Sequence, residues 1–429
     1  MFNTSFQILS TSLVLLIVAG QSSSAIAAML PPTTDTLFVS TLTGKHTDEY
    51  LATMQVQDAG GWINCAVKVY GDGVIKRTYC DEMQKNKSVG IHRVRDYRVL
   101  NGQEWLFLSK KDRMQGDVVK HCVLDANGLL HRCFSMPSLD PHDFMVAPNG
   151  DRIYMFYEAR LNEKKWFSGK PLDLVLRRVN ASNEVVWQWN SAAYFSPEVK
   201  ADSKKWWGSK FVRWLKEVRT SIITNVGVNG GKPLCITLGS TPRCMQMHYI
   251  DYLHANSLEW DKDGGIIVSA RDINTIFKIS LPGGNVEWRI GGYHAGQTDF
   301  KIINDPLEGF SYQHSAKLLA NGNLLLFDNG NDRPDKKTRA VEYKMDWKNR
   351  TAEYLWSYPA PSDYAFRRCC GLVQRLKNGN TLIAWGGWNT DETAESIPVA
   401  DEVTPTGKIA MEIRSRTSTL PYRVWKNEK

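Results

Sequence analysis

The stretch His314-Ser-Ala-Lys-Leu-Leu-Ala-Asn-Gly-Asn-Leu-Leu-Leu-Phe327 contains the pattern on which the fold of this chain depends. A polar residue opens it, an alternating segment follows, and Asn321-Gly322 separates that segment from a second apolar run. Asn-Gly between two such segments is the strongest short-range signal for a β-hairpin. The same frame recurs after His142 and His254, and a fourth copy at 371–385 begins with glycine instead of histidine. The stretch therefore predicts a repeated hairpin with histidine at its start in three copies.

A second repeated element alternates with the first along the chain. It consists of an apolar segment, a turn with Gly or Asn, and a Val- and Ile-rich segment that often ends in Trp; its copies lie at residues 67–76, 122–131, 178–189, 278–288, 345–356 and 403–413. Two hairpins per repeat make a four-stranded antiparallel sheet, and six such sheets close into a β-propeller, which removes exposed sheet edges. We therefore predict an all-β, six-bladed β-propeller, with a pair of β-sandwiches as the alternative. Residues 420–425 have strand character and are expected to complete a blade with the N-terminal segment.

The N-terminal composition sets the expected domain boundaries. Residues 1–28 carry no charge and contain an apolar run and an Ala-x-Ala site, which is typical of a signal peptide. An uncleaved membrane anchor is the alternative, and no later segment is long and apolar enough to cross a bilayer. We expect a short N-terminal segment at 29–60 and the propeller at 61–429. These features predict a periplasmic or secreted protein without a stable membrane span once the signal is removed.

A long gap between repeats, residues 191–247, is rich in Trp and Lys. Trp206, Trp207, Phe211 and Trp214 fall close to helical spacing, with Lys and Arg between them. This pattern predicts a partly helical insertion with an amphipathic helix packed on the propeller. A substrate lid and a membrane-surface helix are the other interpretations.

Charge and cysteine content narrow the function classes. The 429-residue chain has a formal net charge of +8 that is spread along the sequence, which suits anionic small substrates. No nucleic-acid-binding module is recognisable, so we expect no nucleic-acid partner. Eight cysteines in an exported protein predict disulfides.

The positions of the cysteines suggest three pairs, because two of the pairs are symmetric about a predicted hairpin turn and the third flanks a short loop. The expected pairs are Cys65 with Cys80, Cys122 with Cys133, and Cys235 with Cys244. The adjacent Cys369 and Cys370 are left unassigned. A thiol nucleophile or a metal cluster is the alternative use of these cysteines, but their spacings match no common zinc pattern.

The three in-phase histidines are the main candidates for chemistry. The innermost strand of each propeller blade lines the central channel, so equivalent positions in successive blades form a ring around the axis. We expect His142, His254 and His314 to converge there, with Arg271 beside them after the strand at 266–270. A guanidinium among imidazoles suits a tetrahedral oxyanion, whereas it disfavours a cation at the same place. A three-histidine zinc site and separate strand caps remain the alternatives.

Three more positions follow from the same frame. Asn256 lies two residues after His254 and is expected on the same face of a strand. Arg333 ends a polar segment that follows an apolar strand, as Arg271 does, and is a second candidate substrate-binding residue. Gly371 lacks a side chain, and we expect the aromatic ring of a substrate to find room there.

These stretches resemble the bacterial PAPS-independent arylsulfotransferases, exported six-bladed propellers that move a sulfuryl group from a phenolic sulfate to a phenol. The matching segments fall within roughly residues 138–415 and are His142-Asp-Phe, Leu253-His-Ala-Asn-Ser-Leu, Ile267-Val-Ser-Ala-Arg271, Val286-Glu-Trp-Arg-Ile-Gly-Gly, Gln313-His-Ser-Ala and Phe327-Asp-Asn-Gly-Asn-Asp-Arg333. From the short segment before the first repeat, we expect the N-terminal β domain of well-known members to be absent or much smaller here.

The resemblance implies a role for each candidate residue. His314 is the nucleophile and forms a covalent sulfohistidine; His142, His254 and Arg271 hold the sulfuryl oxygens; His254 also protonates the leaving phenolate, and Asn256 supports the pocket. The implied partners are an aryl sulfate donor and a phenolic acceptor, with no cofactor and no metal. An aryl sulfatase that uses the same histidine, and a non-catalytic propeller that binds anionic aromatic ligands, are the alternative functions. The oligomeric state is left open, a homodimer included.

Overall fold

The computed structural model describes residues 37–41, 48–58, 61–80, 92–112, 116–136, 139–160, 169–196, 234–238, 241–245, 248–362, 366–387, 396–416 and 422–428. These residues form strands joined by turns, with short 3₁₀ segments at Ser191–Ala193 (η2) and Arg271–Ile273 (η4). The expected signal peptide and the helix expected around residues 206–214 lie outside the described residues. Within the described ranges, no helix has the length and apolar character needed to span a membrane.

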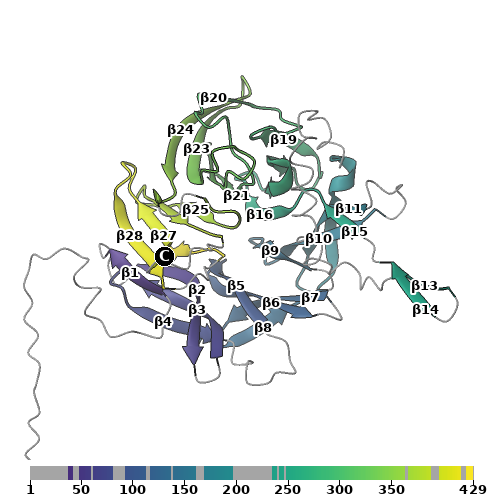
Figure 1. The fold of residues 1–429 in the computed structure, drawn as a ribbon, viewed down its shortest axis with the longest axis horizontal. Helices are drawn as coiled ribbons and strands as arrows, with labels where there is room; N and C mark the ends of the chain where they lie inside the picture. Colours follow the sequence, from purple (N-terminus) through teal and green to yellow (C-terminus); the bar gives the residue numbers. More distant parts are fainter. Residues whose placement is uncertain are drawn as a thin grey trace, which may run out of the picture. The chain divides into compact units, whose positions relative to one another are not determined.

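The strands form a six-bladed β-propeller, as predicted (Figure 1). Blade 1 contains β29 (Trp425–Asn427), β2 (Glu49–Asp58), β3 (Gly61–Tyr70) and β4 (Ile75–Cys80). Blade 2 contains β5 (His92–Leu100), β6 (Gln103–Asp112), β7 (Gly116–Leu124) and β8 (Leu130–Phe134). Blade 3 contains β9 (Leu139–Val146), β10 (Arg152–Ala159), β11 (Gly169–Val179) and β12 (Val185–Asn190).

The other three blades carry most of the residues singled out in the sequence. Blade 4 contains β16 (Ala255–Trp260), β17 (Ile266–Ala270), β18 (Thr275–Ile279) and β19 (Val286–Gly291). Blade 5 contains β21 (His314–Leu318), β22 (Leu324–Asp328), β23 (Arg339–Asp346) and β24 (Thr351–Pro359). Blade 6 contains β25 (Leu372–Arg375), β26 (Thr381–Ala384), β27 (Ile397–Val403) and β28 (Ile409–Ser415).

The innermost strand of each blade lies next to the central axis (Figure 1). In blades 2 to 6 these strands are β5, β9, β16, β21 and β25. In blade 1, β29 is the edge strand that contacts β5 and β25. Three more strands extend the blades: β1 (Leu37–Thr41) pairs with β28, β15 (His248–Asp251) pairs in parallel with β11, and β20 (Lys301–Ile303) pairs in parallel with β24. In the insertion, β13 (Leu234–Leu238) and β14 (Thr241–Met245) form a separate hairpin.

The predicted Asn-Gly turns join the strands as hairpins. Between β21 and β22, Gly322 has φ 84°, a conformation that glycine adopts without a steric penalty. The Gly322 N–H donates to the Leu319 carbonyl at 2.8 Å, and the Leu319 N–H donates to the Asn323 carbonyl at 2.8 Å. Two apolar runs of the opening stretch are thereby paired, and β22 is buried along its whole length.

Both ends of the described chain close the propeller. The C-terminal strand β29 pairs with β2, with Tyr50 opposite Lys426, and so completes blade 1. The N-terminal strand β1 pairs with β28 and extends blade 6. Residues 420–425 were expected to supply the closing strand, and the strand begins at Trp425. The propeller boundary expected at residue 61 is too late, because β1 and β2 within the expected N-terminal segment are both strands of the propeller.

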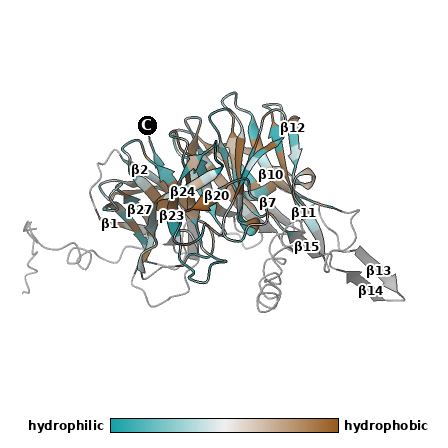
Figure 2. Cartoon of the chain, turned by 90° about the horizontal axis from the view of Figure 1, so that it is seen from above, coloured by the Kyte–Doolittle hydropathy of each residue, from teal (hydrophilic) through white to brown (hydrophobic). Residues whose placement is uncertain are grey.

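Each interface between neighbouring blades contains a hydrophobic core. Six clusters of buried residues fill the six interfaces, and the cluster between blades 4 and 5, for example, includes Ile290, Phe310 and Leu326. Figure 2 shows hydrophobic residues concentrated in the strands and hydrophilic residues in many of the connecting turns. Six such interfaces in a closed ring hold the inner strands, and hence the residues at their ends, in fixed positions.

The predicted register of the cysteine hairpins is present in the structure. Cys122 and Cys133 lie opposite each other on β7 and β8 and form a disulfide. Cys65 is also disulfide-bonded, and Cys80 lies opposite it in the β3–β4 pairing. The backbone of Cys235 lies opposite that of Cys244 in the β13–β14 hairpin, where their disulfide stays a prediction.

Candidate active site

Three histidines lie on, or directly before, three neighbouring inner strands. His142 lies on β9, His254 directly precedes β16, and His314 is the first residue of β21. The rings of His142 and His254 meet edge to face, with their centroids 4.8 Å apart. His314 is close enough to both rings, and to Arg271, to interact with all three electrostatically. The structure therefore brings the four residues predicted from the repeat phase into one cluster.

Arg271 is held beside these histidines by main-chain and side-chain contacts. It is the first residue of η4, and its main-chain N–H donates to the His254 carbonyl at 3.2 Å. Its Nε donates to Asp272 Oδ1 at 2.8 Å, and its guanidinium stacks 5.0 Å from the centroid of the Tyr312 ring. Because Nε is used by Asp272, the two terminal amino groups are the donors suited to a bidentate oxyanion.

His142 and His254 each have a carboxylate partner from a nearby residue. His142 Nδ1 lies 2.8 Å from Asp140 Oδ1, and His254 Nδ1 lies 2.7 Å from Asp251 Oδ2. The main-chain N–H groups also donate to these carboxylates at 2.8 Å, that of His142 to Asp140 and that of His254 to Asp251. A carboxylate on Nδ1 fixes the orientation of the ring and leaves Nε2 as the ring nitrogen that is available to a substrate.

His314 differs in its partner and in its burial. Its ring is almost fully buried, and its Nδ1 lies 2.7 Å from Asn329 Oδ1 and 3.1 Å from the Tyr312 carbonyl. Asn329 Nδ2 donates to the carbonyls of Arg367 and Cys370, so Oδ1 is the amide atom that faces the ring. Both neighbours of Nδ1 are acceptors, and Nδ1 therefore carries the proton while Nε2 has the free electron pair.

Nε2 of His314 accepts a hydrogen bond from the main-chain N–H of Cys370 at 3.1 Å. Burial lowers the pKa of His314 well below its usual value, and the positive charge of Arg271 lowers it further, while the hydrogen bond with Asn329 opposes both. His314 is therefore neutral at neutral pH. A neutral, oriented imidazole with a basic Nε2 is a competent nucleophile.

Asn256 lies beneath the cluster instead of lining it. Its side chain is fully buried, and its Nδ2 donates to the Gln313 carbonyl at 2.8 Å, directly before His314. The expected alternation fails because His254 has φ 47° and lies outside the strand, so it does not share the two-residue period of β16. Asn256 thus supports the backbone that carries His314.

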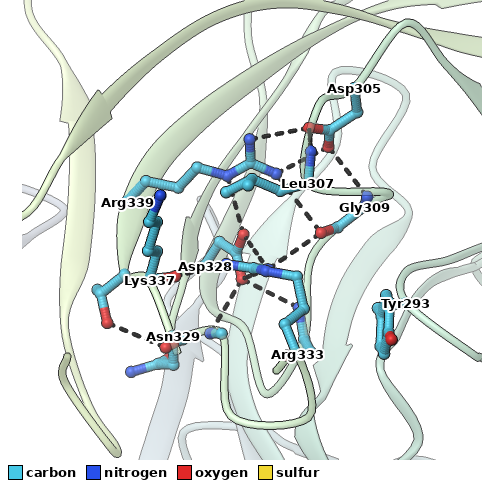
Figure 3. A network of polar contacts seen from close by, with 12 residues as sticks. Tyr293, Asp305, Leu307, Gly309, Asp328, Asn329, Arg333, Lys337 and Arg339 are labelled. Atoms are coloured by element: carbon cyan, nitrogen blue, oxygen red, sulfur yellow. Dashed lines mark hydrogen bonds and ion pairs between the residues drawn. The ribbon is translucent and has the colours of Figure 1, made fainter. Parts of the chain in front are cut away.

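Arg333 does not act as a free anion-binding group, contrary to the expectation from the sequence. It is 2% exposed, and its Nη1 donates to both oxygens of Asp328 at 2.8 and 2.7 Å and to the Gly309 carbonyl at 3.0 Å. Its Nη2 donates to the Lys337 carbonyl. Figure 3 shows the guanidiniums of Arg333 and Arg339 converging on Asp328, with Asp305 as the second carboxylate of Arg339. This network holds the loop after β22, which includes Asn329, in place.

Gly371 does not leave an open space for a substrate ring. A side chain at this position would lie 2.4 Å from Cε1 of Phe327, so the volume that a histidine fills in the other copies is taken by the protein's own phenylalanine. The glycine also has φ 104°, which favours a residue without a side chain. The fourth copy lacks histidine for reasons of packing.

Sequence reasoning missed several groups at the site. Asp140 and Asp251 lie two and three residues before their histidines, a spacing that was visible in the sequence. Asn329 and the Cys369–Cys370 pair come from distant segments, and no local signal connects them to His314. Tyr422 is another: its ring lies 6.3 Å from that of His142, and burial raises the pKa of its hydroxyl, which therefore stays protonated.

The channel below the histidines is filled by buried charges. Arg423, two residues before the closing strand β29, lies 3.3 Å from Asp96 and 3.4 Å from Asp143, and donates to the Asn256 carbonyl at 2.7 Å. Arg98 pairs with the same Asp143 at 2.6 Å. Burial alone would raise the pKa of Asp143, but Arg423 and Arg98 outweigh it and lower the pKa. The C-terminal segment therefore forms part of the floor beneath the site.

Two cavities lie away from the histidines. One of about 370 Å³ is lined by Val146, Trp260, Lys317 and Lys426, at the far ends of the inner strands. Another, of about 860 Å³, is lined by Trp187, Trp260 and Pro282 on the outer side of blades 3 and 4. Neither cavity is lined by a histidine, so we place the candidate active site at the cluster of His142, His254, His314 and Arg271. Within the described residues, no group of three His, Cys, Asp or Glu side chains is arranged to hold a metal ion.

The fold is a six-bladed propeller, and a cluster of three histidines and one arginine lies beside its inner strands. The family model described as Arylsulfotransferase (ASST) matches residues 54–423, and the chain belongs to this family. Arylsulfate sulfotransferase AssT of Lelliottia amnigena is 38% identical over 88 residues, and the same-named protein of Escherichia coli O6:H1 is 34% identical over 88 residues. Each match spans 18% of this chain and 15% of the relative.

Solved structures with a similar chain trace have little sequence identity. A Bacteroides caccae protein of unknown function has 10% identity and a TM-score of 0.46 over 89% of this chain and 99% of that chain. The periplasmic gluconolactonase PpgL of Pseudomonas aeruginosa has 11% identity and a TM-score of 0.42 over 88% and 98% of the two chains.

Proposed function

We propose that the protein is an arylsulfotransferase that moves a sulfuryl group from a phenolic sulfate ester to a phenol through a sulfohistidine on His314. One observation carries the proposal: His314 is buried, neutral and oriented by Asn329, next to an arginine and two carboxylate-held histidines. Membership in the arylsulfotransferase family supports the reaction class. Sulfuryl transfer needs such a nucleophile together with donors for the equatorial oxygens.

In the first half-reaction, Nε2 of His314 attacks the sulfur of the donor. The Nε2–S bond forms, the bond from sulfur to the phenolic oxygen breaks, and His254 gives its proton to the departing phenolate. Arg271 and His142 hold the sulfuryl oxygens as their charge is redistributed. The Cys370 N–H, which donates to Nε2 in the free enzyme, loses this acceptor as the electron pair goes to sulfur.

The second half-reaction reverses these steps with a new phenol. His254 accepts the phenolic proton, the phenolate oxygen attacks the sulfur, and the Nε2–S bond breaks to restore neutral His314. A covalent intermediate shared by two substrates predicts ping-pong kinetics. Tyr422 is a further donor that we place near the phenolic oxygen, because its protonated hydroxyl is buried beside His142.

The test uses 4-nitrophenyl sulfate and follows nitrophenolate release by absorbance, with and without phenol. We expect release that depends on phenol, with parallel lines in double-reciprocal plots when donor and acceptor are both varied. Equal release without phenol would identify an aryl sulfatase. If the ester binds but no phenolic acceptor produces turnover, the protein is a non-catalytic propeller that binds anionic aromatic ligands.

We also propose that the protein works in the periplasm or outside the cell. The disulfide between Cys122 and Cys133 supports this location, because disulfides persist in oxidising compartments. The uncharged, apolar residues 1–28 support export through a signal peptide. Homodimer formation stays a prediction, which the molar mass from light scattering tests.

A further inference from the structure

Two adjacent cysteines with free thiols lie next to the candidate nucleophile. Cys369 and Cys370 precede β25 in blade 6, and both are partly exposed. Their sulfur atoms are 2.8 Å apart, so the two side chains point toward each other. The other cysteines with a described bonding state, Cys65, Cys122 and Cys133, are in disulfides. This pair thus differs in chemistry from the rest of the described cysteines.

The segment that carries the two thiols holds both nitrogens of His314. The main-chain N–H of Cys370 donates to Nε2 at 3.1 Å. The carbonyls of Arg367 and Cys370 accept from Asn329 Nδ2 at 2.9 and 3.1 Å, and Asn329 in turn binds Nδ1 of His314. A change in the backbone of Cys369 and Cys370 would therefore alter the hydrogen bonds at both Nδ1 and Nε2 of His314.

Close packing holds this segment in an unusual conformation. Cys370 has φ 68°, a value that is uncommon for a residue with a side chain. A side chain on Gly386 would lie 2.1 Å from the Gly371 nitrogen and 2.6 Å from Cys370 Cβ, so glycine at 386 is needed for this close approach. The juxtaposition of the two thiols is thus imposed by the surrounding structure.

The charges around the pair make Cys369 the more reactive thiol. A hydrogen bond from Cys370 lowers the pKa of Cys369, and the positive charges of Arg271, Arg368 and His254 lower it further against the effect of burial, to about 7. The hydrogen bond to Cys369 and burial raise the pKa of Cys370. At neutral pH the reduced site therefore contains Cys369 in both its thiol and its thiolate form. The hydrogen bond of the adjacent Cys370 N–H to His314 Nε2, at 3.1 Å, places this pair at the cluster that includes Arg271.

We propose that Cys369 and Cys370 form a vicinal disulfide, and that this modification frees Arg271 to bind the sulfuryl group of the donor. In the reduced protein the Cys369 thiolate competes with the anionic donor for the same guanidinium, and in the oxidised protein this negative charge is gone. The second part of this inference rests on the proposed function, and the first part does not.

The oxidation balances as two thiol–disulfide exchanges with a low-molecular-weight or protein disulfide. The Cys369 thiolate attacks one sulfur of the oxidant, whose S–S bond breaks and releases one thiolate. Cys370 loses its proton and attacks Cys369 Sγ, which forms the vicinal S–S bond and releases the second thiolate. Two electrons pass to the oxidant, which leaves as two thiols, and the two cysteine protons pass to solvent or to these thiolates.

The first experiment tests whether the disulfide forms, without reference to activity. The full chain is incubated with oxidised glutathione, alkylated without reduction, and digested, and the peptide with Cys369 and Cys370 is weighed. We expect a peptide that is two hydrogen atoms lighter than the reduced form and resistant to alkylation until a reductant is added. Two alkylated cysteines, or two glutathione adducts, in the oxidised sample would overturn the proposal.

The second experiment tests the link to Arg271 through the KM for 4-nitrophenyl sulfate in oxidised and reduced protein. The thiolate and the donor exclude each other from Arg271, so the KM of the reduced protein should rise with the ratio of thiolate to thiol. At a pH one unit above the Cys369 pKa, the reduced protein should therefore have a KM about tenfold higher than the oxidised protein. At a pH one unit below that pKa, the two KM values should be nearly equal. Calorimetry of 4-nitrophenyl sulfate binding to His314→Ala should show the same ratio in Kd, so the prediction is tested even if turnover is absent.

The matched control is the double variant Cys369→Ser and Cys370→Ser, which keeps Cys65, Cys122 and Cys133. Its KM should be the same with and without reductant and should not change as pH passes through the Cys369 pKa. A redox response that persists in this variant would assign the effect to the other disulfides. Equal KM values for oxidised and reduced wild-type protein above that pKa would also contradict the proposed role of Arg271.

Discussion

His142 and His254 share one kind of environment, and His314 has another. The first two hold carboxylates on Nδ1, at 2.8 Å from Asp140 and 2.7 Å from Asp251, and their side chains are 18% and 15% exposed. His314 holds an amide oxygen and a carbonyl on Nδ1 and is almost completely buried. All three open the same repeated hairpin, so their difference comes from their partners and not from their place in the fold.

The partner on Nδ1 distinguishes the roles that we propose for the three rings. A carboxylate holds Nδ1 of His142 and of His254, and we propose that their Nε2 atoms serve as donors to a sulfuryl oxygen or a phenolate. A neutral amide offers no such charge, and burial beside Arg271 lowers the pKa of His314 well below its usual value. We therefore propose His314 as the nucleophile and His142 and His254 as donors, and substitutions at these rings and their partners should have different effects.

The largest effect is expected from His314→Ala. Loss of the nucleophile should lower kcat with 4-nitrophenyl sulfate by at least about 10³-fold, because the covalent route is closed. The matched control is His131→Ala, at an exposed histidine on β8, which should retain wild-type kcat. His314→Ala with more than about a tenth of wild-type kcat would remove His314 from the nucleophilic role.

The next effect is expected from Asn329→Asp, which gives His314 the kind of partner that His254 has. The carboxylate should raise the pKa of His314, so the ring becomes protonated at a higher pH and loses its electron pair. We expect kcat/KM to fall about 10- to 100-fold at pH 7, with recovery as pH rises through the new pKa. The pH profile distinguishes this effect from misfolding, and an unshifted acidic limb would contradict it.

A smaller effect, dependent on the leaving group, is expected from His254→Ala. Without the proton donor, poor leaving phenols should suffer most, with a loss of about 10²-fold for phenyl sulfate. The loss should be smaller for 4-nitrophenyl sulfate, whose phenolate departs without protonation. The measurement is the slope of log kcat/KM against the pKa of the leaving phenol. A slope identical to that of the wild type would place the acid elsewhere, with Tyr422 as the first alternative.

The smallest effect is expected from Asp251→Asn and Asp140→Asn. Each replaces a charge-assisted hydrogen bond to histidine by a neutral one, which should reduce kcat/KM about tenfold while the melting temperature stays close to wild type. The loss in Asp251→Asn should be larger for phenyl sulfate than for 4-nitrophenyl sulfate, since Asp251 positions the His254 ring that we propose as the proton donor. An equal loss with both esters would contradict the proton-donor role.

The sequence predicted the fold because its pattern was local and repeated. The Asn321-Gly322 turn and its counterparts specify hairpins, and the phase of the repeat places three histidines at one mouth of the channel. The same logic failed for Asn256, because His254 adopts φ 47° outside the strand. The phase of the repeat predicts which residues lie near the site, but the backbone conformation of each residue determines where its side chain points.

The partners of His314 could not be predicted from the repeat. Asn329 belongs to blade 5 and Cys370 to blade 6, and their contacts with the ring depend on how two blades pack. Arg333 resembled Arg271 in its place after a strand, yet the buried Asp328 binds it and leaves no donor for a substrate. Pairing between distant charged residues is set by tertiary packing, and a single sequence carries no signal for it.

The most direct test of the account is to trap the covalent intermediate. The protein is mixed with 4-nitrophenyl sulfate in the absence of phenol, quenched under alkaline conditions, digested and analysed by mass spectrometry. We predict one sulfuryl group on the peptide with His314, bound to Nε2, and its loss when phenol is added before the quench. A sulfuryl group on His142 or His254, or phenol-dependent turnover with no modified His314, would contradict the proposal that His314 is the nucleophile.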